Sequence, residues 1–335
     1  MNVFQTYCII FCQNKVKKGK QKYGIIKQIY SRKEISFKMT KNKQQMTDLV
    51  PTLRRNRTGV LASGARKGDD FNRYLFLATT HDYVLFFSNK GQVYMLRGYQ
   101  IPEASRKAKG TAIVNLLQLR QGEKITAVIN VPEFCDGKYL FMTTNRGTVK
   151  RCKLTDFSSV RKNGLKAIAL HDGEELISVK ITDGNASVLL ATHEGMAIHF
   201  EEQDVRCMGR AAHGMKGITL YDNDYVVAMD TVCDESGYVL TVTENGLAKR
   251  TQIAEYNKQK RGGKGRINCR LTQKTGLVAG MCIVQSKDKL FIFSAKGYVL
   301  CMDVNELKCH HRIISGVIAM RLREGDIVTS ICRAR

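Results

Sequence analysis

The chain has 335 residues, of which 43% are hydrophobic and 8% aromatic, a composition typical of folded proteins with an apolar core. It contains only three prolines and no tryptophan, which excludes a proline-rich linker protein. The formal net charge of +24 favours a polyanion as partner, nucleic acid before an anionic membrane surface.

Three features argue against membrane, secreted and zinc-ribbon proteins. The sequence has no run of about 18 apolar residues, as a transmembrane helix requires, and its N-terminal apolar patch lacks the basic start of a signal peptide. Eleven cysteines, an odd number without C-x-x-C pairs, argue against a disulfide framework and a zinc ribbon. We therefore expect them to be small buried apolar residues in a reducing cytoplasm.

Residues 1–58 differ in composition from the rest of the chain. They contain 10 Lys and 4 Arg against Glu34 and Asp48, a net charge of +12 that is half the total. Charge runs without apolar periodicity seldom fold alone. We therefore predict a basic leader that is disordered or lies outside the repeat described next, with a basic arm that contacts DNA as the alternative.

From residue 59 onward, short runs of β-branched and aromatic residues meet at a glycine. YVLFFSNKGQVYML contains Gly91 and YLFMTTNRGTVKRC contains Gly147, and similar runs surround Gly195, Gly246 and Gly297. The intervals between these glycines are 56, 48, 51 and 51 residues. A turn glycine between two such runs is the signature of a tight β-hairpin.

A second glycine recurs about 19 residues after most of the turn glycines. Gly110, Gly217, Gly265 and Gly316 hold this position, and Gly164 comes two residues early. Each unit then closes with a polar turn and another apolar strand, as in DGEELISVKI. A period near 50 residues with about four strands predicts an all-β, propeller-like array. We expect five four-stranded blades, with VLASGARKGDDF as part of a partial sixth.

The most basic stretch of this region is Lys258–Arg266, in which five of nine residues are cationic and three of the others are glycine. Glycine leaves the backbone uncovered and free to approach a partner closely. Arginine and lysine carry charges suited to phosphate. The stretch therefore predicts contact with a phosphate backbone without base readout, and a flexible, solvated basic loop is the alternative.

Several segments resemble, in the same order and at similar spacing, the C-terminal region of the DNA gyrase A subunit, a member of the type IIA topoisomerase family. They are ATTHDYVLFFSNKGQVYMLRGYQIPEASRKAKGTAIVNLL, TTNRGTVKR, VRCMGRAAHGMKGITL and TENGLAKRTQIAEY. QKRGGKG at 259–265 resembles the gyrase A box, whose usual form is Q-R-R-G-G-R/K-G. The resemblance covers residues 59–335 and implies a six-bladed β-pinwheel whose neighbouring blades exchange strands and whose basic rim wraps DNA.

The resemblance also implies a function, which is DNA binding and wrapping without sequence specificity, in support of ATP-dependent negative supercoiling by the holoenzyme. It implies no cofactor in this chain, with ATP and Mg²⁺ confined to the partner subunit and the catalytic core. The implied partners are double-stranded DNA, the gyrase A N-terminal region and the gyrase B subunit, with no membrane, in the cytoplasm at the nucleoid. The breakage–reunion region with its catalytic tyrosine does not precede these segments, so we expect no catalysis by this chain alone.

The chain departs from the family pattern in where its box lies. Family members commonly carry the box in the first blade, where this chain has LRRNRTG at 53–59. The intact box lies instead in the unit opened by Gly246. A truncated or frameshifted gene is one explanation for the leader and the missing catalytic region. The alternatives to a gyrase A domain are the corresponding domain of topoisomerase IV, with a degraded box, and a propeller that binds proteins, whose rim would lack this charge.

We expect DNA contacts from the box and from basic residues at equivalent levels of the other units. In and beside the box these are Lys258, Gln259, Lys260, Arg261, Gly262, Gly263, Lys264, Gly265 and Arg266. Elsewhere they are Arg106, Lys107, Lys109, Lys150, Arg151, Arg161, Lys162, Arg210, Lys216, Lys249 and Arg250. One cluster per blade forms a band around the rim, and such a band bends DNA through contacts with its backbone.

Other candidate sites are weaker. Cys301, Cys309, His310 and His311 do not form a metal-ligand pattern, because adjacent histidines seldom face one ion. The acidic turn at 222–224 lacks the rest of a calcium loop. We find no nucleophile–base pair and no phosphate-cradling GKS or GKT motif, and expect neither a metal nor an active site.

Overall fold

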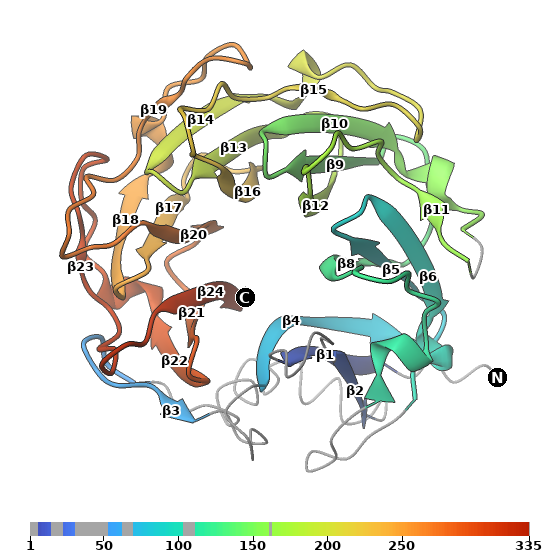
Figure 1. The fold of residues 1–335 in the computed structure, drawn as a ribbon, viewed down its shortest axis with the longest axis horizontal. Helices are drawn as coiled ribbons and strands as arrows, with labels where there is room; N and C mark the ends of the chain where they lie inside the picture. Colours follow the sequence, from blue (N-terminus) through green and yellow to red (C-terminus); the bar gives the residue numbers. More distant parts are fainter. Residues whose placement is uncertain are drawn as a thin grey trace.

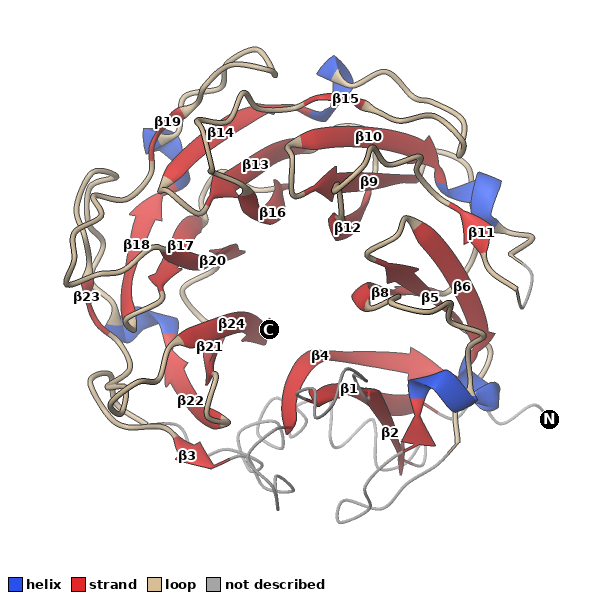
Figure 2. Ribbon diagram, in the orientation of Figure 1, coloured by secondary structure: helices blue, strands red, loops and turns tan. Residues whose placement is uncertain are grey.

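The computed structural model describes residues 6–14, 23–30, 53–61, 70–102, 111–160 and 163–334. Within these residues the fold is all-β, as predicted, and the sheets surround a central axis to form a disc (Figure 1). The helices of this part are short 3₁₀ segments near the rim (Figure 2). They are η1 (Gly98–Gln100), η2 (Ile113–Asn115), η3 (Leu154–Phe157), η4 (Glu202–Asp204), η5 (Ile253–Glu255) and η6 (Val304–Glu306).

The strands of the described residues form six four-stranded sheets, numbered here in chain order by their hairpins and given from the axis outward. The first three are β4 (Asp70–Thr79), β1 (Thr6–Asn14), β2 (Tyr23–Tyr30), β7 (Thr111–Ala112); β8 (Ile125–Val131), β5 (Tyr83–Ser88), β6 (Gln92–Arg97), β11 (Leu165–Lys166); and β12 (Leu176–Thr182), β9 (Tyr139–Thr144), β10 (Thr148–Lys153), β15 (Met215–Lys216). The last three are β16 (Val226–Val232), β13 (Ser187–Thr192), β14 (Met196–Glu201), β19 (Arg266–Ile267); β20 (Val278–Val284), β17 (Tyr238–Thr243), β18 (Leu247–Gln252), β23 (Val317–Ile318); and β24 (Val328–Ala334), β21 (Lys289–Ser294), β22 (Tyr298–Asp303), β3 (Val60–Leu61).

The outermost strand of each sheet comes from the next unit of the chain. β19 follows the hairpin β17–β18 but pairs with β14 of the preceding sheet, through Ala197↔Arg266 and Met196↔Ile267. β3 comes from the first unit and pairs with β22 of the sixth sheet, through Val299↔Val60 and Tyr298↔Leu61. The predicted exchange of strands between neighbouring blades is therefore confirmed, and β3 closes the ring.

The strand pairing differs from the prediction for residues 1–58. β1 and β2 lie in this segment, pair with each other, and continue the sheet to β4 on one side and β7 on the other. The predicted partial sixth blade is consequently a four-stranded sheet, and the predicted boundary at residue 58 cuts through it. The hairpin β1–β2 has no turn glycine at the repeat spacing, so the glycine pattern does not reveal it.

The hairpin strands are buried on both faces because each sheet packs between two neighbours. Leu85 and Phe87 of β5 pack toward Leu140 and Met142 of β9, while Phe86 of β5 lies in a different cluster. A strand that is buried on both faces reads as a continuous apolar run without alternation, which explains sequences such as YVLFFS.

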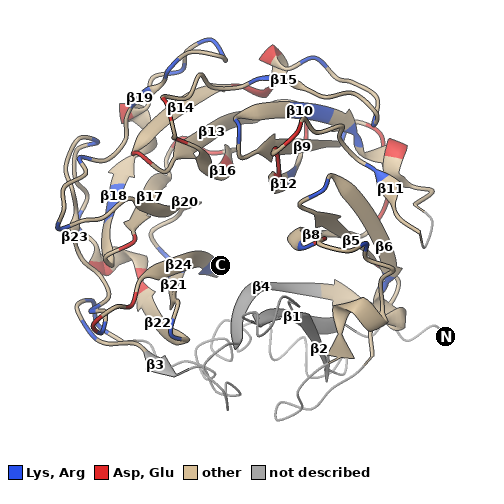
Figure 3. Cartoon of the chain, viewed as in Figure 1, with Lys and Arg blue, Asp and Glu red and all other residues tan. Residues whose placement is uncertain are grey.

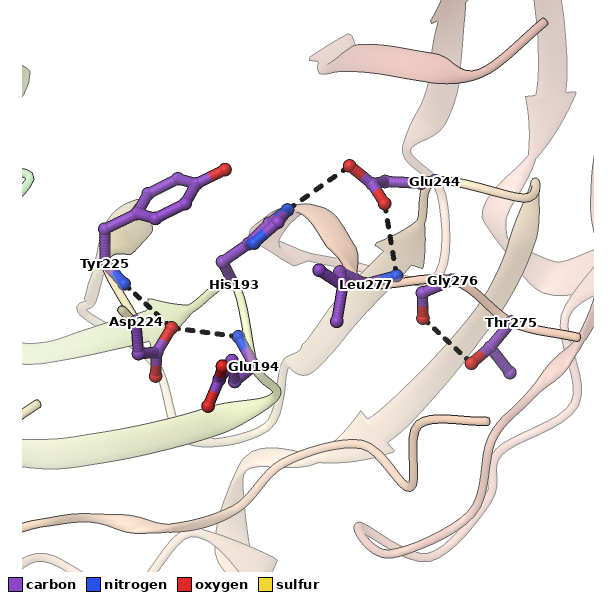
Figure 4. A network of polar contacts seen from close by, with 8 residues as sticks. All are labelled: His193, Glu194, Asp224, Tyr225, Glu244, Thr275, Gly276 and Leu277. Atoms are coloured by element: carbon purple, nitrogen blue, oxygen red, sulfur yellow. Dashed lines mark hydrogen bonds and ion pairs between the residues drawn. The ribbon is translucent and has the colours of Figure 1, made fainter. Parts of the chain in front are cut away.

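Neighbouring blades are also joined where the hairpins turn (Figure 4). His193, which follows β13, stacks on Tyr225 with ring centroids 4.4 Å apart, and its Nε2 lies 3.2 Å from Glu244 Oε1 of the next hairpin. The other carboxylate oxygen of Glu244 accepts a hydrogen bond from the Leu277 N–H at 3.3 Å. These contacts hold the fourth and fifth sheets at a fixed relative position.

The cysteines are less buried than expected. The nine cysteines whose side chains are described are free thiols. Cys152, Cys269 and Cys301 are buried, whereas Cys135, Cys207, Cys233 and Cys309 are exposed. The exposed cysteines lie on turns and loops outside the hairpin strands. The sequence has no apolar repeat there from which burial could be predicted.

Candidate nucleic-acid interface

A seven-residue segment precedes each of four short outer strands and runs across the rim onto the preceding sheet. We call these segments the rim loops. They are 53–59 before β3, 208–214 before β15, 259–265 before β19 and 310–316 before β23. The loop 259–265 is the QKRGGKG stretch, so the predicted box lies on the rim between η5 and β19, and Figure 3 shows Lys and Arg gathered on these outer loops.

The loop 259–265 is docked through its backbone on the preceding unit. Gln259 N–H donates to His199 O at 2.8 Å, Gly262 N–H donates to Gly217 O at 2.6 Å, and Thr219 N–H donates to Gly263 O at 2.9 Å. The alternative of a flexible solvated loop is therefore wrong. The Gly262 N–H already has an acceptor, so the expectation that this group approaches phosphate is wrong as well.

The glycines of this loop have different roles. Gly265 has φ +75°, and a Cβ there would lie 2.5 Å from Ala197 O, so only glycine fits. Gly262 has φ +82°, but its Cβ would lie 3.7 Å from the nearest atom. At Gly263 a Cβ would make only ordinary contacts, the shortest 3.5 Å from Gln259 Oε1. Packing therefore does not require glycine at 263, which leaves this position as the bare backbone that a phosphate can approach.

The cations of the loop and of its two flanking residues, Lys258 and Arg266, divide into side chains that already bind protein groups and side chains that face solvent. Arg261 donates from Nε to Asp204 O and from Nη1 to Lys216 O, both at 2.9 Å. Lys258 pairs with Glu235 at 2.7 Å and Glu201 at 3.0 Å, and these hydrogen bonds raise its pKa above the usual range.

The remaining cations, Lys260, Lys264 and Arg266, are exposed. Lys264 Nζ lies 5.1 Å from the centroid of the Tyr221 ring, a cation–π contact that orients its ammonium. These three side chains are the charges that the loop and the residue directly after it can offer to a ligand.

Lys150 and Lys249, both expected to contact DNA, are buried. Lys150 Nζ donates to Ala167 O, Arg210 O and Ala212 O, and Lys249 Nζ donates to Asn268 O and Arg312 O. Burial lowers the pKa of Lys150 and brings that of Lys249 to about 8. The prediction is wrong for this pair, because the ammonium groups bind backbone carbonyls between blades instead of facing solvent.

The other predicted contact residues have varied surroundings. Arg151 stacks over Tyr139 at 5.0 Å and Arg250 over Tyr238 at 4.7 Å. Arg210 donates to Asp156 O at 2.6 Å, and Lys216 is exposed at the end of β15. Arg106, Lys107, Lys109, Arg161 and Lys162 lie outside the described residues.

The loop 53–59, LRRNRTG, docks in the same way as the box. Leu53 N–H donates to Cys301 O at 2.8 Å, Asn56 N–H to Ala319 O at 2.7 Å, and Arg321 N–H to Arg57 O at 3.0 Å. Cys301 holds the same place in β22 as His199 does in β14, and Ala319 and Arg321 follow β23 as Gly217 and Thr219 follow β15. Asn56 has φ +64° where the box has Gly262. The signal that could have revealed this loop is the glycine that ends it, Gly59, directly before a short apolar strand.

The same comparison corrects one predicted position. Gly214, with φ +113°, precedes β15 as Gly265 precedes β19, and a Cβ there would lie 2.7 Å from Val149 O. The sequence assigned this place to Gly217, which instead follows β15 and donates its N–H to Gly147 O at 2.8 Å. The spacing separates the two glycines, because Gly214 lies 19 residues after Gly195, as Gly265 does after Gly246, whereas Gly217 lies 22 residues after it.

The described residues hold two other polar features. A cavity of about 370 Å³ lies at the axis among the inner strands, where Lys180 and Asp230 pair at 2.9 Å. Burial opposes ionisation of Asp230, but Lys180 and Arg333 hold its pKa below the usual range.

No group of three His, Cys, Asp or Glu side chains in the described part could hold a metal ion, and no helix there is long and apolar enough to cross a membrane.

Comparison with known proteins supports the resemblance seen in the sequence. A family model described as DNA gyrase C-terminal domain, beta-propeller, matches residues 82–132, 138–183, 186–233, 237–284 and 288–331. The DNA gyrase A subunits of Haloquadratum walsbyi and Escherichia coli are each 42% identical over 278 residues. The alignments cover 82% and 83% of this chain and 32% of each relative, so the chain spans about a third of their length.

Two solved structures share the fold over nearly the whole chain. A DNA gyrase A C-terminal domain has a TM-score of 0.75 at 24% identity and covers 98% of this chain and 99% of its own. A DNA topoisomerase IV C-terminal domain has a TM-score of 0.77 at 22% identity and covers 100% and 94%. The fold therefore does not separate gyrase from topoisomerase IV. The match of the family model across five units does assign the chain, which belongs to the DNA gyrase C-terminal domain family.

Proposed function

We propose that this chain binds duplex DNA along its rim without reading base sequence, and bends it, as the DNA-wrapping domain of a DNA gyrase A subunit. The observation that carries this proposal is the docked loop 259–265, which presents Lys260 and Lys264 to solvent, with Arg266 directly after it. Cations on a fixed backbone suit a regular array of phosphates better than cations on a mobile tail, because less conformational entropy is lost on binding.

Further exposed cations supply contacts at other points of the rim. Lys216 lies at the end of β15, and Arg54, Arg55 and Arg57 lie on the loop that closes the ring. Bending a segment of 20–30 base pairs by 40–90° costs about 1–6 kcal/mol, so contacts at several blades are needed to offset it. A disc with cations on successive blades provides them.

The wrap would present a neighbouring DNA segment for strand passage by a complete enzyme. Gyrase A N-terminal and gyrase B polypeptides would supply the chemistry, ATP hydrolysis and Mg²⁺, and this chain would act without a cofactor of its own, in the cytoplasm at the nucleoid. The exposed lysine and arginine side chains on the rim would bind DNA and take no part in breaking or joining it. This role fits a domain that is not catalytic alone.

The corresponding domain of topoisomerase IV is the second candidate, because its fold matches equally well. The intact QKRGGKG stretch favours gyrase. A protein-binding propeller is less consistent with exposed cations around the rim.

The proposal is tested with the full 335-residue chain and a nicked circular plasmid. The complex is ligated and deproteinised, and we expect a shift in linking number that grows with protein concentration. Affinity for short duplexes should fall with log[salt] with a slope of about −0.9 per phosphate contacted. DNA binding without a linking-number shift would favour the topoisomerase IV alternative, and a slope near zero would contradict backbone binding.

A further inference from the structure

An arginine occupies the third position of each of the four rim loops. These residues are Arg55, Arg210, Arg261 and Arg312, and three of them donate to backbone carbonyls of the preceding unit. Arg210 Nη1 donates to Asp156 O at 2.6 Å, Arg261 donates to Asp204 O and Lys216 O, and Arg312 Nη1 donates to Ile267 O.

The accepting carbonyls come from two kinds of position, and each kind is structurally equivalent from one blade to the next. Asp156 and Asp204 are the third residues of η3 and η4, and Lys216 and Ile267 are the second residues of the outer strands β15 and β19. The outer strands have no further strand beyond them, and a 3₁₀ segment leaves its last carbonyls without an intrahelical partner. A guanidinium with several donors in a fixed plane can satisfy both sites at once.

The loops differ in what lies beneath them. Below 208–214 and 310–316 are Lys150 and Lys249, whose buried ammonium groups bind loop carbonyls, including Arg210 O and Arg312 O at the third position. The corresponding residue below 259–265 is Ile198, whose side chain approaches Gly263 and offers no donor. The box therefore lacks the lysine that fastens two of the other loops.

We propose that Arg261 is a positioning residue, which fastens the box to the fourth sheet and does not itself contact DNA. The box depends on this arginine more than the loop 208–214 depends on Arg210, because Lys150 holds that loop as well. Without Arg261, the loop would lose two side-chain bonds to the rim. Its backbone hydrogen bonds and the bond from Thr219 Oγ1 to Gly262 O would then open more often. Lys260 and Lys264 would then no longer stand at fixed places along the DNA path. The part of this proposal that concerns DNA rests on the proposed function.

Hydrogen exchange on the full chain without DNA tests the fastening directly. In Arg261→Ala we expect the Gly262 and Thr219 amides, which carry the docking bonds, to lose about tenfold or more of their protection, because two hydrogen bonds from a charged group are lost. In the matched control Arg210→Ala, the Ala169 amide, which donates to Ala212 O, should change by less because Lys150 still holds that carbonyl. Equal loss at the two loops would overturn the dependence on Arg261.

Salt titration of duplex binding separates positioning from contact. Arg261→Ala should leave the slope of log K against log[salt] unchanged while the linking-number shift decreases, whereas Lys264→Ala should reduce the slope by about 0.9. Arg261→Lys, which keeps the charge but can reach one carbonyl only, should restore part of the amide protection. A slope lowered by about 0.9 in Arg261→Ala, with unchanged protection of Gly262, would show a phosphate contact and overturn the proposal. If the wild-type chain bound no DNA, the proposed function would fail while the exchange result still decided the role of Arg261.

Discussion

The loops 259–265 and 53–59 are docked alike although they share few residues. Each donates its first N–H to a carbonyl of the neighbouring hairpin and its fourth N–H to the residue after the outer strand, and each accepts a hydrogen bond at its fifth carbonyl. The fourth residue is left-handed in both, as Gly262 or Asn56. The seventh is a glycine in both, because a Cβ would meet Ala197 O at 2.5 Å or Val299 O at 2.7 Å.

The comparison separates what builds a rim loop from what makes the box distinctive. Docking needs a residue that tolerates positive φ at the fourth position and a glycine at the seventh. The box then differs at its fifth and sixth positions, where it has Gly263 and Lys264 in place of Arg57 and Thr58. We therefore expect a phosphate to approach the box most closely at Gly263, where the backbone is uncovered and Lys264 follows.

The largest expected effect is on stability and comes from replacing the glycine that both loops have at their seventh position. Gly265→Val places a β-branched side chain at φ +75° and against Ala197 O, and we expect a loss of about 3–5 kcal/mol in the free energy of unfolding from backbone strain and overlap together. Urea denaturation of the full chain measures it.

The matched control is Gly262→Asn, which introduces the residue that loop 53–59 has at the same place. It should cost no more than about 1 kcal/mol, because asparagine tolerates the left-handed region. Similar losses for the two variants would show that the two glycines do not have the separate roles assigned to them.

The next effect concerns DNA curvature. Lys260→Ala with Lys264→Ala removes exposed charge without touching a docking bond, so we expect the linking-number shift to fall by more than half and the salt slope to fall by about 1.8. Adding Arg261→Ala, which also unfastens the loop, should abolish the shift while leaving much of the binding, because most of the +24 charge remains.

The corresponding double variant of the other loop is Arg54→Ala with Arg57→Ala. It should lower the salt slope by a similar amount but reduce the linking-number shift less, since this loop has no bare glycine at its fifth position. If the shift fell equally in both double variants, the distinction between the two loops would be lost.

The sequence predicted the parts of the fold that repeat locally. Turn glycines such as Gly91 and Gly147 lie between strands that are neighbours in the chain, so the hairpins are visible as a period. The environment of Lys150 and Lys249 could not be predicted in this way. Each follows an apolar run and precedes an arginine, as a strand end facing solvent also would, and the carbonyls that receive the ammonium come from residues about 20 to 60 positions later. The strands β1 and β2 were missed for a different reason: they pair as neighbours in the chain, but no turn glycine at the repeat spacing marks their hairpin.

The loop 53–59 can also be converted to the residue pattern of the box. Converting 53–59 to the pattern of the box by Asn56→Gly, Arg57→Gly and Thr58→Lys should leave the docking bonds in place, since all three of those bonds are made by the backbone. We expect a larger linking-number shift at an almost unchanged salt slope, because one cation is lost and one is gained. A shift equal to that of the wild type would indicate that Gly263 and Lys264 owe their effect to the position of the fourth sheet and not to their chemistry.

The smallest expected effect is a pH dependence that should belong to the box alone. The carbonyl that receives the Gln259 N–H comes from His199, whereas the one that receives the Leu53 N–H comes from Cys301. His199 is buried, with Nδ1 2.7 Å from Tyr256 O and Nε2 2.7 Å from Ser187 Oγ. A carbonyl only accepts, so Nδ1 carries the hydrogen of the neutral ring.

Burial lowers the pKa of His199 below its ordinary value of 6.5. As the pH falls below 6.5, the unfolded chain therefore takes up a proton that the folded chain still refuses, and stability is lost until the folded pKa is passed. The loss is at most about 1.4 kcal/mol for each pH unit between the two pKa values. We expect Gln259 to lose amide protection between pH 7 and pH 5.5, after correction for intrinsic exchange, while Leu53 keeps its protection. His199→Gln, which retains a side-chain donor and acceptor, should remove the difference. A decline of equal size at both amides, or one that persists in His199→Gln, would place the titrating group elsewhere and remove His199 as the source of acid sensitivity under the box.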